Sequence, residues 1–339
     1  MYESFYGLSE LPFELTANPK YLFLNASQRE ALSTLQYGLF AAKSLTVLIG
    51  EAGTGKTTLI KAALESDRCR NVRCVYLNNP TLRPHDFIRL LALKLDLGRN
   101  AGESKALLLE RLELLLRERR AAGQITALVV DEAQSLSIET LEEIRLLANI
   151  ETPSTKLLPL VLAGQPELGV RLEDPNLRQL KQRVTLRAQL QPFEMADTAA
   201  YIASRITTAG GVPGRIFTLD AVKLIHQYSD GIPRTISVIS DNALVSGMAA
   251  GRQRVDRATV AEVCRDLHLT TRTPLPSAAA RTPQPETAQA LTPHSGAHEN
   301  VTIPDEDAHP QKTPDSSRRD PVGPRVVALL RRVGRTITE

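Results

Sequence analysis

The first segment that could carry chemistry is a run of nine residues that matches G-x-x-x-x-G-K-[ST] in full: Gly50, Glu51, Ala52, Gly53, Thr54, Gly55, Lys56, Thr57 and Thr58. Glycines allow the backbone to form a cradle whose N–H groups point at anionic oxygens. Lys56 can then reach the β- and γ-phosphates, while the Thr57 hydroxyl can ligate Mg²⁺. An ordinary glycine-rich turn is the alternative, but the run also follows an apolar stretch and opens a helical pattern. We therefore predict a site for ATP and Mg²⁺.

A second segment places two adjacent carboxylates, Asp131 and Glu132, directly after the apolar run 127–130. Neighbouring side chains of a strand point in different directions, so Asp131 can serve the metal while Glu132 faces the attacking water. The alternative is that the pair only starts the next helix, as a cap and a first-turn acid. Together with the phosphate-binding loop, the functional interpretation is favoured.

Apolar runs and helical patterns alternate around these two segments. Strands are predicted at Leu45–Ile49, Val72–Leu77, Ile125–Val130, Leu157–Ala163 (weakened by Pro159) and Val184–Leu190. Helices are predicted between them at Thr57–Glu65, His85–Leu95, Ser104–Arg120 and Ile138–Asn149. This alternation is typical of βαβ units, and it predicts an α/β fold with a parallel sheet sandwiched between helices.

The sequence pattern changes after Pro192 and again near residue 270, and the whole chain is therefore predicted to have four regions. Only helices are expected next, at Glu194–Thr208, Leu219–Tyr228, Arg234–Ala249 and Arg257–Leu267. From residue 270 prolines accumulate among Ser, Thr, Ala and Gln, which is typical of disorder. We predict an ATPase core at 1–192, a small helical lid at 193–269, a disordered linker at 270–324 and a short basic amphipathic segment at 325–339. That last segment could contact a membrane, or it could be a frayed terminus.

Composition limits the class of protein and its compartment. The 41 basic and 38 acidic residues give a net charge of only +3, which is not the footprint of a dedicated nucleic-acid binder. Three cysteines without a CxxC pair predict neither a disulfide framework nor a zinc site. No signal peptide or transmembrane run is visible, so we expect a cytoplasmic protein, associated with the inner face of the membrane through partners if at all.

The strand Val72–Leu77, between the two chemical segments, is typical of the P-loop ATPases that have an additional strand and a catalytic glutamate. Within that branch the chain resembles the ExeA/GspA group of AAA+ ATPases, the general secretion pathway protein A group. The resemblance covers roughly residues 1–268 and rests on the phosphate-binding loop, on DEAQ at 131–134 and on three further stretches. These are an N-terminal signature (FYGL at 5–8, PF at 12–13, YLFL at 21–24, REAL at 29–32), LAGQPEL at 162–168 and DGIPRT at 230–235.

The resemblance implies further roles by position. Glu132 would act as base or water-positioner, Gln165 as the sensor-1 residue and Arg234 as the sensor-2 residue on the phosphates, although either of the last two could be an ordinary helix-start residue. Arg183, or failing it Arg178, would be an arginine finger acting on a neighbour's ATP, which implies a homo-oligomer; a solvated basic face is the alternative. Residues in Leu8–Phe13 and Tyr21 could contact adenine or simply pack.

For function, the resemblance implies an ATPase that drives or regulates assembly of a bacterial secretion, pilus or exopolysaccharide-export machine, with an envelope or secretion-machine protein as partner. Relatives often continue into a membrane span and a peptidoglycan-binding domain, which this sequence lacks, so we expect action from the cytoplasmic side. A DNA-associated ATPase of the transposition-helper or replication-initiator type is the alternative, as the sequence pI of about 8.8 permits. A slow, nucleotide-gated interaction module is a third.

Overall fold

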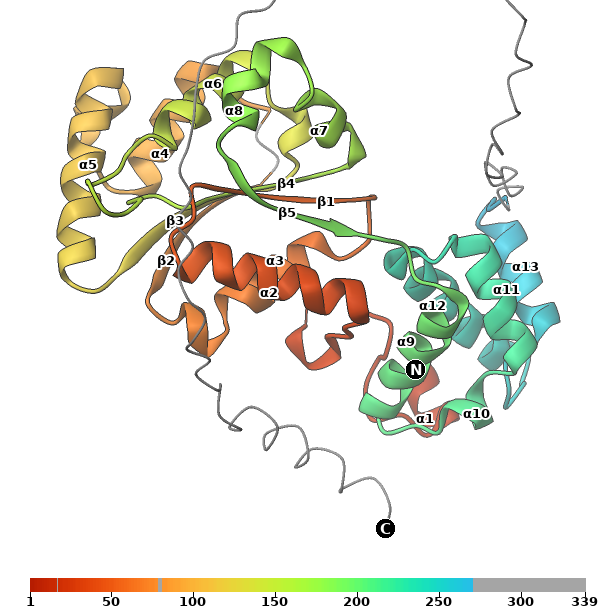
Figure 1. The fold of residues 1–339 in the computed structure, drawn as a ribbon. Coiled ribbons are helices and arrows are strands. Elements are labelled where there is room, and N and C mark those ends of the chain that lie inside the picture. Colours follow the sequence, from red (N-terminus) through yellow and green to blue (C-terminus); the bar gives the residue numbers. More distant parts are fainter. Residues whose placement is uncertain (17, 79–80, 271–339) are drawn as a thin grey trace, which may run out of the picture. The chain divides into compact units, whose positions relative to one another are not determined.

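A five-stranded parallel sheet forms the centre of the larger part of the molecule (Figure 1). The computed structural model describes residues 1–16, 18–78 and 81–270. The strands are β1 (Leu45–Gly50), β2 (Val72–Leu77), β3 (Ile125–Val130), β4 (Leu160–Gly164) and β5 (Val184–Leu190), in the spatial order β2-β3-β4-β1-β5. All pairs are parallel, so the carboxyl ends of β1, β3 and β4 meet at one edge. Both predicted chemical segments follow strands that end there.

Helices cover both faces of this sheet, as the predicted fold class requires (Figure 1). One face packs on α2 (Ala26–Phe40) and α3 (Lys56–Leu64) through a cluster that includes Leu48 and Val129. The other packs on α4 (Pro84–Lys94), α5 (Lys105–Ala121), α6 (Ile138–Leu147), α7 (Pro166–Arg171) and α8 (Arg178–Lys181). Successive side chains of a strand point to opposite faces, and β1 is buried along its whole length. This explains its unbroken apolar run.

The sheet domain differs from the sequence prediction at β4, at α2 and at the short helices α7 and α8, which were not predicted. The fourth strand was expected from Leu157, but β4 begins at Leu160 because Pro159 has no N–H to donate to the ladder; its carbonyl still accepts from Leu128 N at 3.0 Å. Helix α2 was not predicted. Its start carries a capping box, in which the Asn25 side chain accepts from Gln28 N (2.9 Å) and the Gln28 side chain accepts from Asn25 N (3.2 Å).

The second hydrophobic cluster consists mainly of helix residues, from α9 (Met195–Thr208), α10 (Pro213–Ile216), α11 (Leu219–Ser229), α12 (Pro233–Ala249) and α13 (Arg257–Asp266). The N-terminal helix α1 (Tyr2–Tyr6) packs here as well, although residues 1–192 were predicted as the core. Phe13 is almost fully buried in this cluster, edge-to-face with Phe217 at 6.3 Å between ring centroids. Both faces of the sheet are covered by other helices, and the large N-terminal side chains Tyr2, Tyr6 and Phe13 are buried among the lid helices instead.

The predicted linker beyond Thr270 and the basic segment 325–339 lie outside the described residues. Among the residues that are described, no helix is long and apolar enough to cross a membrane.

Candidate nucleotide-binding and hydrolysis site

The loop between β1 and α3 adopts the backbone that its glycines permit. Gly53 (φ +81°) and Gly55 (φ +97°) lie in the left-handed region, and Thr54 Oγ1 donates to Glu51 O at 2.8 Å. A Cβ atom at Gly50 would lie 2.8 Å from that same Thr54 oxygen. The loop therefore needs glycine for both backbone angle and space, and it forms the cradle that the sequence predicted for a phosphate.

Lys56 is buried at the start of α3, with 5% of its surface exposed. Its ammonium donates to the main-chain carbonyls of Gly50 (2.8 Å) and Glu51 (3.1 Å). Burial holds the pKa of Lys56 below its ordinary value, while the nearby carboxylates of Glu132 and Asp131 act in the opposite direction. In the described part of the chain no carboxylate lies within ion-pair distance of this ammonium, so its charge is available to an anion.

Asp131 lies at the end of β3, 1% exposed, and faces Thr57. Thr57 Oγ1 donates to Asp131 Oδ2 at 2.6 Å, and Glu132 N donates to Oδ1 at 3.0 Å. Mg²⁺ prefers oxygen ligands. Here a hydroxyl and a carboxylate lie side by side next to the phosphate-binding loop. Thr57 and Asp131 thus fit the predicted metal.

Tyr76 on β2 is a third partner of this pair, and the sequence analysis did not identify it. Its hydroxyl donates to Asp131 Oδ2 at 2.5 Å. Burial, and then the hydrogen bond to Asp131, raise the pKa of Tyr76, so the phenol keeps its proton and remains a donor. The strand register explains the contact, since Tyr76 lies opposite Val129, two residues before Asp131 on the neighbouring strand.

We expect Tyr76→Phe to weaken metal binding without weakening nucleotide binding. Loss of a hydrogen bond that orients a metal-binding carboxylate typically costs about 10-fold in metal affinity. The Mg²⁺ concentration that gives half of the full ADP-induced rise in melting temperature should increase by about that factor, and the Mg²⁺ midpoint of ATP turnover should follow. Tyr37→Phe, on the exposed side of α2, is the control. An unchanged Mg²⁺ midpoint in Tyr76→Phe would contradict the role.

Glu132 follows Asp131 in a left-handed backbone conformation (φ 54°) and its side chain lines the same cavity as Lys56 and Thr57. Gln134 Nε2 donates to Glu132 Oε2 at 2.6 Å, and Gln165 Nε2 lies 3.4 Å from the same oxygen. The structure thus brings the predicted base and the predicted sensor-1 residue together at the ends of β3 and β4. Gln134 is a second residue that the sequence analysis gave no role of its own.

The lid reaches the loop through Arg234. Its N–H donates to Gly53 O at 3.2 Å, and a Cβ added at Gly53 would lie 2.8 Å from Arg234 Cβ. The cavity of about 350 Å³ beside the loop is lined by loop residues, by Glu132 and Arg234, and by a group of N-terminal and lid residues. That group consists of Glu14, Leu15, Thr16, Asn18, Tyr21, Tyr201, Arg205, Pro233 and Ser237.

Tyr21 is the one residue of the suggested adenine contacts that lines this cavity, since Leu8 and Phe13 are buried in the lid cluster. The guanidinium of Arg205 lies 5.1 Å from the ring centroids of both Tyr21 and Tyr201. All three flat groups line the cavity, and such groups can pack against a nucleobase.

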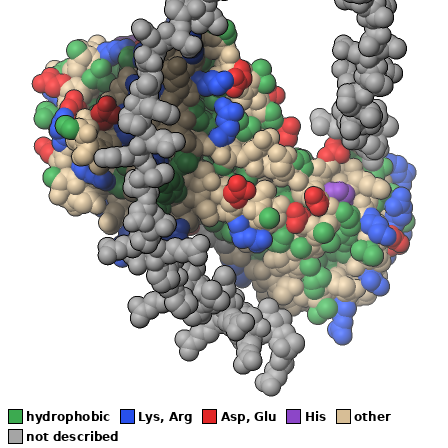
Figure 2. Space-filling model, viewed as in Figure 1, with side chains coloured by type: hydrophobic (Ala, Val, Ile, Leu, Met, Phe, Trp, Pro, Cys, Tyr) green, Lys and Arg blue, Asp and Glu red, His purple; other side chains and the backbone are tan. Residues whose placement is uncertain are grey.

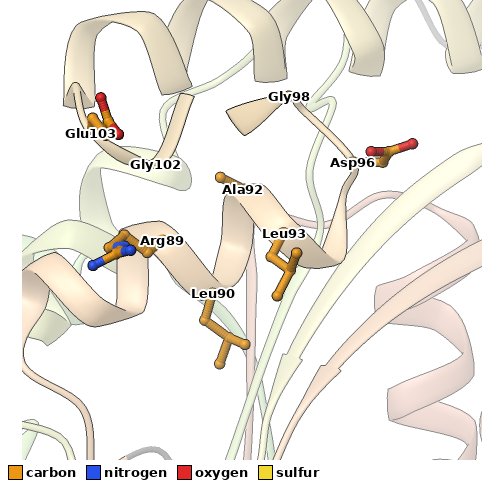
Figure 3. A pocket seen from close by; sticks show the side chains of 8 residues that line it. All are labelled: Arg89, Leu90, Ala92, Leu93, Asp96, Gly98, Gly102 and Glu103. Carbon is orange, nitrogen blue, oxygen red and sulfur yellow. The ribbon is translucent and has the colours of Figure 1, made fainter. Parts of the chain in front are cut away.

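Arg183 and Arg178 are exposed near the two ends of α8, and neither lines the cavity. The single chain therefore does not bring the predicted finger residues to the site. A larger cavity of about 720 Å³ lies elsewhere, between α4 and the segment 96–103 that follows it (Figure 3). Leu90 and Leu93 line it, and its charged residues Arg89, Asp96 and Glu103 come from three separate points of its rim (Figure 3). We assign it no chemistry.

Comparison with known proteins agrees with this geometry. The AAA domain family matches residues 41–172. Among solved structures, the Aeropyrum pernix ORC2 protein in its ADPNP–ADP complexes superposes with a TM-score of 0.58 at 17% identity, over 78% of this chain and 73% of that one. Drosophila ORC bound to DNA gives 0.59 at 19%, over 76% and 65%. At such identity the similarity concerns the fold.

The phosphate-binding loop, the parallel sheet and the domain match together show that the chain contains an AAA domain with a P-loop, at residues 41–172. The chain is related to general secretion pathway protein A of Aeromonas hydrophila, with which it shares 40% identity over 255 residues. That alignment covers 75% of this chain and 46% of the relative, so the chain spans less than half of that protein's length. The resemblance predicted from the sequence motifs is confirmed.

Proposed function

We propose that the chain binds and hydrolyses ATP with Mg²⁺, and that its turnover drives or regulates assembly of a bacterial secretion, pilus or exopolysaccharide-export machine. The observation that supports the chemistry best is that Lys56, Thr57 and Glu132 line one cavity, while Asp131 accepts a hydrogen bond from the Thr57 hydroxyl. Phosphoryl transfer to water needs a cation, a metal-binding pair and a carboxylate next to the bound phosphate.

Each residue of the site has its own role in binding or hydrolysing ATP. Main-chain N–H groups of the loop and Lys56 hold the β- and γ-phosphates, while Thr57 and Asp131 hold Mg²⁺. The bound ion would neutralise charge that develops on the phosphate oxygens. Glu132 orients the attacking water and takes its proton, Gln165 contacts the γ-phosphate, and Arg234 joins the lid to the nucleotide. Arg183 of a neighbouring copy completes the site in a homo-oligomer.

The process is proposed from the relative rather than from the site. General secretion pathway protein A is named for secretion, and 75% of this chain aligns with it at 40% identity. A partner in the cell envelope would then hold the ATPase at the inner face of the membrane. Acidic and basic side chains are interspersed over the sheet domain on the face shown in Figure 2, and the net charge of the chain is only +3, which is not the footprint of a dedicated DNA-binding protein.

Cross-linking of an ATP-locked variant tests this proposal. Glu132→Gln should bind ATP but turn it over about 10²-fold or more slowly, because the base is lost. With ATP present, it should capture an envelope protein that Lys56→Met, which cannot bind ATP, does not. Salt-sensitive DNA binding that strengthens with ATP, together with no envelope partner, would instead support the replication-initiator or transposition-helper alternative. Liposomes in a parallel sample test direct lipid contact.

A further inference from the structure

We infer that Gln134 is a positioning residue for ATP hydrolysis, which fixes the carboxylate of Glu132 and leaves Gln165 free for the phosphate. The inference rests on the proposed function, since it concerns the residue proposed as base. It starts from the hydrogen bond of 2.6 Å between Gln134 Nε2 and Glu132 Oε2. Hydrogen bonds to a charged carboxylate are about twice as strong as neutral ones.

The surroundings define which way the Gln134 amide points. Its Oε1 accepts the main-chain N–H of Gln165 at 3.1 Å. A flipped amide would place an oxygen against the Glu132 carboxylate and an NH₂ group against the Gln165 N–H, which loses both bonds and adds two repulsions. The side chain therefore has one favourable orientation, with its donors toward Glu132.

Space and backbone also hold Gln134 in place. Gly164 ends β4 beside it, and a Cβ atom there would lie 2.8 Å from Gln134 Oε1. Arg171, at the end of α7, donates from Nη1 to the Gln134 main-chain carbonyl. The Gln134 side chain and main chain are thus anchored next to β4 and to α7, so the donor that holds Glu132 is itself fixed.

The two glutamines have unequal contacts with Glu132. Gln165 Nε2 lies 3.4 Å from Glu132 Oε2, well beyond the 2.6 Å of Gln134. The weaker contact costs little to exchange for a phosphate oxygen. Gln134 fixes Oε2 of the Glu132 carboxylate, and the other oxygen of Glu132, Oε1, is left for the attacking water. A loose carboxylate would lose this geometry, and misplacement by about 1 Å can cost about 10²-fold in rate.

The test is Gln134→Met, which is of similar length but makes no hydrogen bonds. This variant should lower kcat by about 10- to 100-fold, with KM for ATP, ADP affinity and melting temperature close to wild type. In a Glu132→Ala background, Gln134→Met should have almost no further effect. Gln124→Met is the control, since Gln124 is half-buried ahead of β3, at the other end of the sheet.

Several results would overturn the inference while the wild type still hydrolyses ATP. These are an unchanged or increased kcat in Gln134→Met, a loss that multiplies with that of Glu132→Ala, or a loss matched by weaker ADP binding and lower stability. A wild type without ATP turnover would reject the proposed function itself, so the two failures can be told apart.

Discussion

Lys56→Met should abolish ATP turnover and nucleotide binding without destabilising the free protein. A buried ammonium is costly, as the lowered pKa of Lys56 shows, and methionine fills similar space without a charge to desolvate. Removal leaves the Gly50 and Glu51 carbonyls without this donor, which offsets part of that gain. The melting temperature without nucleotide should therefore stay close to that of the wild type or rise.

The nucleotide-dependent part of the stability should disappear. A ligand at about 100 times its Kd stabilises a protein by about 2.7 kcal/mol, and a variant that does not bind gains nothing. Melting curves with and without ADP and Mg²⁺ measure both quantities on one sample. Lys61→Met, further along α3 and exposed, is the matched control and should keep the full ADP-induced shift. A full shift in Lys56→Met would show that the lysine does not hold the phosphates.

Local signals explain why the loop and the sheet were predicted well. β1 and β3 are apolar runs buried on both faces, and the loop has a fixed glycine spacing. Both features can be recognised from consecutive residues. β5 begins and ends at its predicted residues, Val184 and Leu190. Helix α2 had an equally local signal in its capping box, so its omission was avoidable.

The contacts of Tyr76 and Gln134 could not be predicted in the same way. Tyr76 meets Asp131 because β2 and β3 pair in one register, and Gln134 meets Gln165 because β4 lies next to β3. The periodicity of one strand does not say which strand is its neighbour. The N-terminal helix is the extreme case, since Tyr2 donates to Asp241 across 239 positions of sequence. Such partners follow from tertiary packing alone.

Arg183→Ala should reduce ATP turnover by about 10³-fold or more, the lower end of what arginine fingers contribute, and leave ADP binding unchanged. The geometry separates this residue from its own site: Arg183 is exposed after α8 and does not line the cavity of its own chain. If it acts, it acts on another copy. Specific activity should then rise with protein concentration, because only assembled chains have complete sites.

Mixing two inactive variants tests this directly. Lys56→Met cannot bind nucleotide but carries Arg183, while Arg183→Ala has an intact loop but no finger. In mixed oligomers the first can supply the arginine that the second lacks, so turnover should recover in part. Arg178→Ala, also exposed and basic, is the matched control and should stay active alone. If Arg178→Ala is the inactive variant that Lys56→Met rescues, the finger is Arg178. If turnover ignores concentration and both arginines, each chain hydrolyses ATP by itself.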